Sequence, residues 1–400
     1  MKTAIIGGGA AGFFAAITCA EASPGNEVHI FERGKTVLEK VRISGGGRCN
    51  VTHHCFDARE LTKNYPRGSR ELIGPFSRFG PEDTVQWFSS RGVQLKTESD
   101  GRMFPVTDSS QTIIDCLSRA AHDAGVKVHT SSRIEKISRR PDSRWQLDDQ
   151  TFDQVMVAAG SSTSMWEVLA GLGHTIVTPV PSLFTFNTRD TRLRDLSGVS
   201  VQRARLRVPG TRLTSEGPLL ITHWGLSGPA ALRLSAWGAR EFREMDYKFQ
   251  LEIRFSADPG GFDEWFAHHR QHNGKKTVTS HTQEGIPARL WQRLTEAAGI
   301  DSQKRWADLD KALAQQLYGQ IACARFQITG KSTNKDEFVT AGGVSLREVN
   351  FSTFESRICP GLFMAGEILD IDAITGGFNF QAAWTGGYLA GMAMAENTQL

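Results

Sequence analysis

Residues 7–12 read Gly-Gly-Gly-Ala-Ala-Gly and directly follow a short apolar stretch at residues 3–6. The spacing is G-x-G-x-x-G, in which each glycine has a separate role. Gly7 allows a tight turn out of a strand, Gly9 lets the backbone approach a pyrophosphate, and Gly12 lets the next helix pack closely on the sheet. That helix, predicted over residues 13–22, would present its N-terminal N–H groups to the anion.

A second strand is predicted at residues 28–31, and it ends at Glu32. A carboxylate at this distance from the glycine turn accepts from ribose hydroxyls, and it favours an unphosphorylated adenosine ribose. The ordered pattern therefore predicts a dinucleotide-binding unit. A secretory leader, suggested by Lys2 and the apolar residues that follow it, is the weaker interpretation, because three consecutive glycines make a poor apolar helix. We expect a mature N-terminus and a cytoplasmic protein.

The overall composition sets limits on domain number and partners. A chain of 400 residues exceeds what one core usually holds, so at least two domains are expected. The formal net charge of +3 is small and gives no reason to expect nucleic acid or a membrane as partner. The six cysteines form no C-x-x-C pair, which indicates a reducing compartment and no zinc site. We expect no metal, since His268 and His272 lack a third ligand.

The pattern of apolar residues alternates between strands and helices up to about residue 180. Residues 155–160 form a fully apolar run ending in glycine, as in a parallel strand that is buried on both faces. Further predictions are a helix at 112–124, paired strands at 126–129 and 133–137, and a hairpin at 145–147 and 151–154.

The texture of the sequence changes after Pro179 and Pro181. Short alternating segments separated by glycine and proline turns suggest a small antiparallel sheet or barrel, and three amphipathic helices follow. The αβ pattern resumes at Val339, so a nucleotide-binding domain is interrupted by an insertion. The predicted elements are strands at 184–188, 201–208, 247–255 and 325–329, and helices at 263–272, 286–298, 306–321 and 382–395.

A second glycine cluster lies at residues 42–50. Three adjacent glycines expose backbone N–H groups without Cβ obstruction, and two arginines flank them, so the segment can wrap an anion or a flat ring. We expect this segment to line a cofactor. Its members are Arg42, Ser44, Gly45, Gly46, Gly47, Arg48, Cys49 and Asn50.

Two further motifs lie near the C-terminus. Residues 361–367 read as an apolar strand that ends in Gly366 and Glu367, whose carboxylate can accept from sugar-alcohol hydroxyls at the carboxyl edge of the sheet. Residues 375–381 then lead into the last helix, and its N-terminal N–H groups could stabilise negative charge on a reduced ring.

The order of these motifs resembles the flavoproteins with two dinucleotide-binding domains, in which FAD lies extended across the sheet. More narrowly, the chain resembles the aminoacetone-oxidase-like FAD-binding family, also called the BaiN/RdsA type. The residues that carry this resemblance are 43–50, 101–105, 222–229, 340–344 and 365–380.

The resemblance implies an α/β fold, a Rossmann-like FAD-binding domain interrupted by an inserted small β-barrel domain and a helical cap. This division agrees with the changes of sequence texture. We expect the FAD-binding domain at 1–182 and 338–400, the barrel at 183–257 with a return strand at 322–337, and the cap at 258–321.

The resemblance also implies roles for individual residues. Gly7 to Gly12 would hold the pyrophosphate, Glu32 the adenosine ribose, Ile134 the adenine through its backbone, and Glu367 the ribityl chain. Asn379 and Phe380 would contact the flavin ring. The short segment after Gly160 departs from the longer glycine-rich loop of the family. The remaining expected cofactor contacts are Ala11, Arg33, Ala159, Gly160, Gly366, Gly376 and Gly377, together with the 42–50 cluster.

The motifs favour an FAD-dependent oxidoreductase that acts on a small or medium organic substrate. A reductase with transiently bound NAD(P)H is the leading hypothesis. No second G-x-G-x-x-G follows a strand in the insertion, which favours transient or no binding of NAD(P)H over a separate dinucleotide-binding domain. An amine oxidase that uses O₂ is the first alternative. A non-catalytic flavoprotein, either a redox sensor or an RNA-associated factor, is the second. Candidates for a catalytic role are Arg48, Cys49 and His223.

Overall fold

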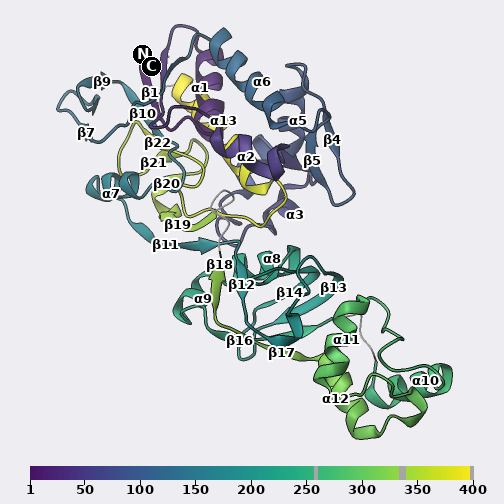
Figure 1. The fold of residues 1–400 in the computed structure, drawn as a ribbon. Coiled ribbons are helices and arrows are strands. Elements are labelled where there is room, and N and C mark those ends of the chain that lie inside the picture. The colour runs from purple at the N-terminus through teal and green to yellow at the C-terminus, as the bar shows by residue number, and fades with distance from the viewer. Residues whose placement is uncertain (256–259, 333–338, 397–400) are drawn as a thin grey trace. The chain divides into compact units, whose positions relative to one another are not determined.

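The computed structural model describes residues 1–255, 260–332 and 339–396 (Figure 1). The chain divides into two compact units, of which unit 1 comprises residues 1–181 and 335–400 and unit 2 comprises residues 182–334. The predicted boundaries at 257/258 and 337/338 lie outside the described residues. Each unit is described by itself below.

Unit 1 is built on a seven-stranded sheet with the order β20-β21-β22-β10-β1-β2-β6. The five strands from β22 to β6 are mutually parallel, and β20 and β21 add an antiparallel edge. The strands are β1 (Lys2–Ile6), β2 (Glu27–Phe31), β6 (Lys127–His129), β10 (Gln154–Val157), β20 (Val349–Asn350), β21 (Glu355–Ser356) and β22 (Leu362–Met364).

The centre of this sheet explains the apolar runs in the sequence. Every residue of β10 and β22 is buried, as are four of the five residues of β1, because helices cover both faces of a parallel sheet. The strand predicted at 155–160 is present as β10 between β1 and β22, but it ends at Val157. The predicted hairpin is also confirmed, as β8 (Trp145–Leu147) and β9 (Gln150–Phe152).

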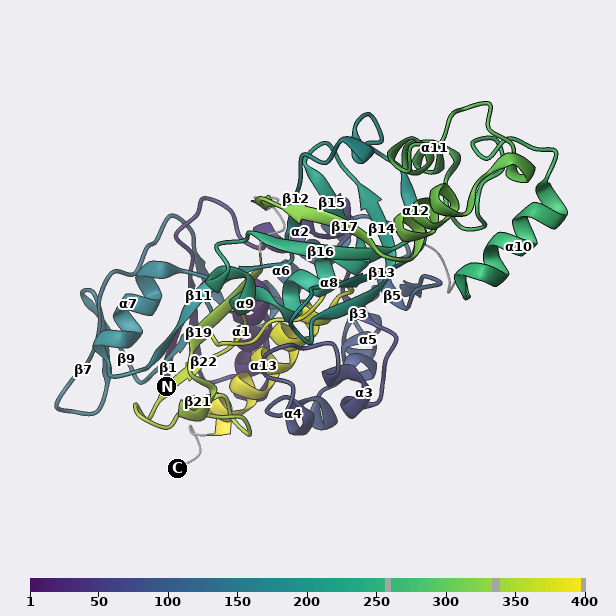
Figure 2. The same cartoon turned by 90° about the horizontal axis from the view of Figure 1, so that it is seen from below.

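Helices α1 (Ala10–Ala22) and α13 (Phe378–Glu396) lie side by side in both Figure 1 and Figure 2. Glycines of α13 let the two backbones touch. A Cβ on Gly387 would lie 2.5 Å from the carbonyl oxygen of Ala11, and one on Gly391 would lie 2.6 Å from that of Ala15. Any larger residue at either position would push the first and last helices of the unit apart.

One predicted strand pair is wrong. β6 pairs with β2 in parallel, while the second strand of the predicted pair is replaced by irregular chain that runs into β7 (Ile137–Arg139), a partner of β8. The reason is that the backbone N–H groups of Ser131 and Ser132 donate to the carbonyls of Gly34 and Glu32, at 2.7 and 2.8 Å, and not to β6.

The remaining elements of unit 1 surround the sheet. The helices are α2 (Glu39–Gly47), α3 (Ala58–Thr62), α4 (Ile73–Arg78), α5 (Pro81–Ser89), α6 (Ser110–Asp123) and α7 (Thr163–Gly171). The other strands are β3 (Thr52–His53), β4 (Leu95–Thr97), β5 (Arg102–Pro105), β11 (Ile176–Ser182) and β19 (Val339–Val344).

Unit 2 contains an antiparallel sheet with the order β17-β16-β13-β14-β15-β12-β18. Its two end strands, β17 and β18, are separated in the chain by Thr329 alone, so one continuous stretch pairs with both β16 and β12. The strands are β12 (Thr185–Asn187), β13 (Ser200–Arg207), β14 (Thr214–Ile221), β15 (Gly225–Ser227), β16 (Phe249–Arg254), β17 (Ala324–Ile328) and β18 (Gly330–Ser332).

The helices of unit 2 share one hydrophobic cluster with this sheet, and the cluster includes Phe186 on β12 and Leu317 on α12. The three predicted amphipathic helices are present as α10, α11 and α12. Whether they act as a cap stays a prediction. The helices are α8 (Pro229–Trp237), α9 (Ala239–Glu244), α10 (Phe262–Asn273), α11 (Ala288–Ala297) and α12 (Lys311–Ala322).

No helix in the described ranges combines the length and the apolar character that crossing a membrane requires.

Candidate functional site

Three glycines of the turn after β1 differ in their surroundings: protein atoms crowd Gly7 and Gly12, whereas the space beside Gly9 is open. A Cβ on Gly7, whose φ is +113°, would lie 2.4 Å from the carbonyl oxygen of Ala158. A Cβ on Gly12 would lie 2.0 Å from the carbonyl oxygen of Gly7. At Gly9, in contrast, a Cβ would have no protein atom within 4 Å. The space in front of Gly9 therefore fits a pyrophosphate at the N-terminus of α1.

Glu32 lies at the carboxyl end of β2 and is held against this turn. Its carboxylate accepts from the backbone N–H of Gly8 at 2.9 Å and from that of Gly34 at 2.7 Å. The segment that leads to the buried Ile134 is bonded to the backbone of Glu32, so the predicted ribose and adenine contacts lie at one place. Arg33 is exposed beside them.

The ends of β10 and β22 meet the same edge of the sheet. A Cβ on Gly160, whose φ is +60°, would lie 3.9 Å from a carboxylate oxygen of Glu367, and one on Gly366 would lie 3.5 Å from the Cβ of Ala11. The Lys40 ammonium forms an ion pair with Glu367. Helix α7 begins three residues after Gly160, so the loop there is as short as the sequence indicates.

Glu367→Gln is expected to weaken FAD binding. Losing a charge-assisted hydrogen bond to a ribityl hydroxyl costs roughly 1.5–3 kcal/mol, or about ten- to a hundredfold in affinity. Titration of the apoprotein with FAD, followed by flavin fluorescence, measures the change. The matched control is Lys40→Gln, which removes the protein partner of Glu367 alone. Equal losses in both variants would mean that Glu367 serves its ion pair with Lys40 and does not contact FAD.

The second glycine cluster interrupts helix α2 rather than forming a simple loop. Gly45 (φ +58°), Gly46 (φ +69°) and Gly47 (φ +85°) all adopt left-handed conformations that glycine accepts without strain. A Cβ on Gly46 or Gly47 would meet no protein atom within 4 Å, whereas one on Gly45 would lie 2.9 Å from the ring of Phe104. Two of the three glycines therefore leave the backbone open to a ligand.

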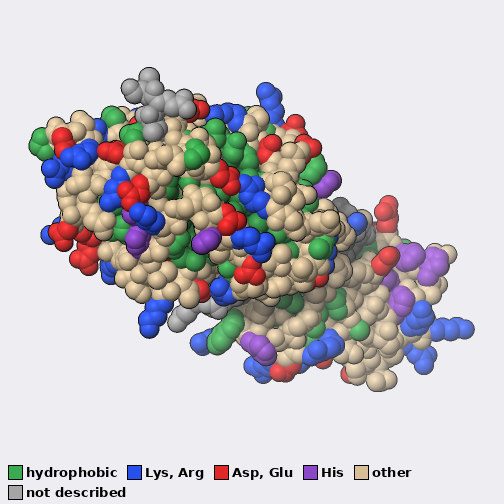
Figure 3. Space-filling model, turned by 90° about the horizontal axis from the view of Figure 1, so that it is seen from above, with side chains coloured by type: hydrophobic (Ala, Val, Ile, Leu, Met, Phe, Trp, Pro, Cys, Tyr) green, Lys and Arg blue, Asp and Glu red, His purple; other side chains and the backbone are tan. Residues whose placement is uncertain are grey.

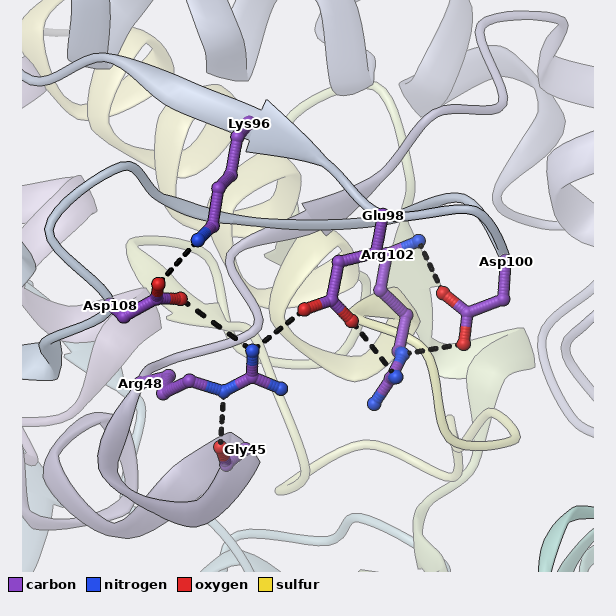
Figure 4. Close-up of polar contacts among 7 residues, drawn as sticks. All are labelled: Gly45, Arg48, Lys96, Glu98, Asp100, Arg102 and Asp108. Carbon is purple, nitrogen blue, oxygen red and sulfur yellow. Dashed lines mark hydrogen bonds and ion pairs between the residues drawn. The ribbon is translucent and has the colours of Figure 1, made fainter.

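Arg48 is surrounded by carboxylates (Figure 4). Its guanidinium lies 2.6 Å from Glu98 and 3.5 Å from Asp108, and stacks 4.0 Å from the centre of the Phe104 ring. Its Nε donates to the carbonyl oxygen of Gly45 at 3.5 Å. The hydrogen bond that Arg48 donates to Glu98 raises the pKa of Arg48. With its charge balanced in this way, Arg48 fits a role in shaping the glycine cluster better than a role as a free cation beside the flavin.

Cys49 is fully buried, with a left-handed φ of 60°. Burial raises the pKa of the Cys49 thiol to about 12, so the thiolate that a nucleophile needs is scarce at neutral pH. Burial also raises the pKa of Cys55. Both observations disfavour thiol chemistry at this cluster.

Asn50 connects the glycine cluster at 42–50 to Gly377, just before α13. With its amide oriented to suit its neighbours, the side-chain oxygen accepts from the N–H of Gly377 at 2.9 Å, and the nitrogen donates to the carbonyl oxygens of Thr52 and Met103 at 3.0 and 3.3 Å. Gly377 has φ +89°, and a Cβ there would lie 2.5 Å from the carbonyl oxygen of Thr52. The segments 45–50 and 376–378 are thus joined across more than 300 positions of sequence.

The start of α13 is fixed by side chains on both sides. The Tyr65 hydroxyl donates to the carbonyl oxygen of Phe378 at 2.5 Å. The Asn379 amide accepts from the N–H of Ala373 at 2.9 Å and donates to its carbonyl oxygen at 3.1 Å. Phe380 stacks on Trp384, with ring centres 5.6 Å apart. Asn379 therefore holds the loop before the helix, and a contact of Asn379 with the flavin stays a prediction.

Two contacts in this region were not anticipated from the sequence. Arg67 forms a bidentate ion pair with the fully buried Asp372, and His53 lies between the Phe378 ring and Gly101, where a Cβ would be 2.4 Å from the imidazole. The Pro-Arg-Gly turn at 66–68 and the Asp-Ile-Asp segment at 370–372 were the available signals, but neither names its partner.

The remaining candidates lie elsewhere. His223 is exposed in unit 2, in the turn between β14 and β15, and its catalytic role stays a prediction. Gly376, with φ +133°, packs against the Phe378 ring. Arg42 and Ser44 hydrogen-bond to Gln111 and to the carbonyl of Val41. Among the described residues, no group of three or more His, Cys, Asp or Glu side chains is placed to hold a metal ion.

Known proteins match this chain over nearly its whole length. The family model described as HI0933-like protein Rossmann domain matches residues 1–393. A 3-dehydro-bile acid delta(4,6)-reductase of Clostridium scindens is 29% identical over 99% of both chains. A ribosomal RNA dihydrouridine synthase of Haemophilus influenzae is 26% identical over 98% of both chains. The protein of the same name from Escherichia coli is 27% identical over 95% of this chain and 94% of that one.

Solved structures share the fold at lower identity. The open conformation of a flavocytochrome c3 fumarate reductase gives a TM-score of 0.50 at 16% identity, over 99% of this chain and 78% of that one. A 3-ketosteroid-delta4-(5alpha)-dehydrogenase from Rhodococcus jostii RHA1 gives 0.50 at 14% identity, over 98% and 96%. At these identities the likeness concerns the arrangement of elements.

Proposed function

This chain belongs to the HI0933-like Rossmann-domain family, and from that premise we propose that it reduces a carbon–carbon double bond conjugated to a carbonyl group. Family membership confirms the resemblance drawn from the motifs, and the chain is an FAD-dependent oxidoreductase. The proposal adds the direction of the reaction, the electron donor and the substrate class.

The observation that carries the proposal is what two differently named full-length relatives have in common. The two double bonds that delta(4,6) denotes lie in conjugation with a 3-dehydro position, and the ring double bond that distinguishes uridine from dihydrouridine is likewise conjugated to a carbonyl. Relatives that share one fold but are named for such different substrates could carry out the same reaction on different molecules. We favour a small-molecule substrate, since the relative with 29% identity carries a small-molecule name.

The residues at the carboxyl edge of the sheet fit FAD. The open space at Gly9 would take the pyrophosphate, Glu32 the adenosine ribose, and Glu367 the ribityl chain. Gly46 and Gly47 present open backbone on the adjoining segment. FAD, when bound, supplies hydride transfer between a donor and the electron-poor double bond. The protein then contributes orientation, through the contacts that join residues 45–50 to the start of α13.

We propose NAD(P)H as a transient donor. The glycine run in unit 2 that comes nearest to a second nucleotide turn, residues 225–228, forms β15 of an antiparallel sheet and leads into α8 without a βαβ unit. This placement favours brief docking of the nicotinamide over a separate dinucleotide-binding domain.

RNA is the second candidate substrate. Two relatives named for ribosomal RNA match almost the whole chain, which favours an RNA substrate. The small net charge of +3 disfavours one. An oxidase that acts on amines and a non-catalytic flavoprotein stay as the alternatives that the experiment below also tests.

Anaerobic mixing tests the proposal. The FAD-loaded protein is mixed with NADH or NADPH while the visible flavin band is followed, and a conjugated 3-dehydro bile acid or a uridine-containing RNA is then added. Bleaching by a nicotinamide and recovery of colour with one of these acceptors is the expected result. Bleaching by amines alone, with recovery only in O₂, would replace the reductase by the oxidase. No bleaching by either class of donor would leave the non-catalytic flavoprotein.

A further inference from the structure

Unit 2 contains a pocket whose lining includes none of the residues expected to contact FAD. It has a volume of about 570 Å³ and lies where the end of α10 meets the segment before α12. In Figure 3, His, Lys and Arg side chains gather over the α10 end of unit 2 on the face in view. The lining residues are Gln271, His272, Asn273, Gly274, Lys275, Lys276, Arg305, Ala307 and Asp308.

The cations of this pocket lack anionic partners. Lys275, Lys276 and Arg305 form no ion pair with any carboxylate in the described ranges, and Asp308 is the one acidic residue among the lining residues. Two other lysines of the unit do have carboxylate partners: Lys248 lies 2.7 Å from Asp246, and Lys311 lies 2.9 Å from Asp263. Three neighbouring positive charges with one negative charge leave an excess that an anion would neutralise.

The backbone that carries these cations is held in place. The N–H of Trp306 donates to the carbonyl of Lys276 at 3.1 Å, and that of Ala307 donates to the carbonyl of Gly274 at 3.1 Å. Buried Asn273 accepts from the Lys276 ammonium at 3.2 Å. Below them, Trp306 is buried and stacks on His269, with ring centres 4.3 Å apart. A bound anion would therefore meet cations on a preorganised scaffold.

The positive charge near the pocket also affects the pKa of a neighbouring histidine, His281. The Lys276 ammonium lies 3.5 Å from Nδ1 of His281, which is outside the pocket lining. Burial lowers the pKa of His281, and the positive charges of Lys276 and His268 lower it further. Repulsion among these groups is what an anionic ligand would relieve.

We propose that this pocket binds a phosphate-bearing ligand through Lys275, Lys276 and Arg305. An arginine fork and two ammonium groups suit the several oxygens and the charge of a phosphate ester. The volume exceeds that of one phosphate, so part of the attached molecule would enter as well. Two sources share this chemistry, a nicotinamide dinucleotide and an RNA backbone. The proposal goes beyond the reductase assignment and does not depend on it.

The test compares wild type with the triple variant Lys275→Gln, Lys276→Gln, Arg305→Gln. The FAD-loaded proteins are titrated with inorganic pyrophosphate, NADPH and a fluorescein-labelled RNA hairpin, at two salt concentrations. Binding of at least one probe should weaken about tenfold or more in the triple variant, and the wild-type affinity should fall with salt. The matched control is Lys248→Gln, an exposed and paired lysine of the same unit, which should bind as wild type does.

The probe that loses affinity identifies the source. A loss with NADPH alone assigns the pocket to a dinucleotide, and a loss with the RNA alone assigns it to a phosphodiester backbone. Equal affinity of wild type and triple variant for all three probes, or no binding of any, would overturn the proposal. If the triple variant fails to fold, Lys275→Gln should show a smaller loss that Lys275→Arg restores. These measurements need no turnover, so their failure is distinguishable from failure of the reductase assignment.

Discussion

Gly9→Val is expected to give a folded protein that retains no FAD. The valine side chain would enter the space in front of the turn, where no protein atom lies within 4 Å of a Cβ. It would exclude the pyrophosphate from the N–H groups of α1, at a cost of at least about a hundredfold in affinity, or ~2.7 kcal/mol. The ratio of flavin to protein absorbance in the purified variant measures the loss, and circular dichroism of the apoproteins measures the fold.

Gly12→Val is the matched control for this prediction. Its Cβ would lie 2.0 Å from the carbonyl oxygen of Gly7, inside the protein itself, so this variant should lose its fold together with FAD. A yellow Gly9→Val protein with the flavin content of wild type would show that the phosphates bind elsewhere.

Asp372→Asn is expected to lower the free energy of unfolding of unit 1 by about 3–5 kcal/mol, because it removes one charge of a buried ion pair and leaves the Arg67 guanidinium undercompensated. The Asp372 side chain is fully buried and that of Arg67 is 10% exposed, so water can replace little of the lost interaction. Urea unfolding of the apoprotein, followed by the fluorescence of the buried Trp384 and its neighbours, measures the change.

Asp142→Asn provides the control for the ion pair. Asp142 lies 2.8 Å from Arg144, but both side chains are well exposed and water can replace the lost contact, so the same substitution there should leave the urea midpoint almost unchanged. Similar effects of the two substitutions would mean that the Arg67–Asp372 pair contributes no more than a surface pair.

Local patterns in the sequence were enough to predict which residues meet at the carboxyl edge of the sheet. The turn at 7–12, the strand that ends at Glu32 and the apolar strand before Gly160 each carry their own signal within a few residues. A glycine at a turn and an apolar strand that is buried on both faces can be recognised from the local sequence, without knowing which residues they contact. The predicted contact residues at these positions therefore lie together at one edge.

Contacts between distant segments could not be predicted in the same way. Lys40 with Glu367, Asn50 with Gly377 and Arg67 with Asp372 each join residues more than 300 positions apart. The polar partners of Arg48 are also distant in the sequence: Glu98 lies in the loop between β4 and β5, and Asp108 lies after β5. The wrong strand at 133–137 has the same origin, because the register of this segment is set by Gly34 and Glu32.

The packing of α13 on α1 has a consequence for how the chain is made. Unit 2 is continuous in sequence, so all of it emerges from the ribosome before β22 and α13 exist. Until then the groove over α1 that receives Gly387 and Gly391 remains bare, and β10 lacks its neighbour on one side. A nascent chain that ends after residue 334 holds every glycine of the 7–12 turn and still lacks the helix that completes the domain around them. The domain around the 7–12 turn is therefore complete only once the final helix has arrived.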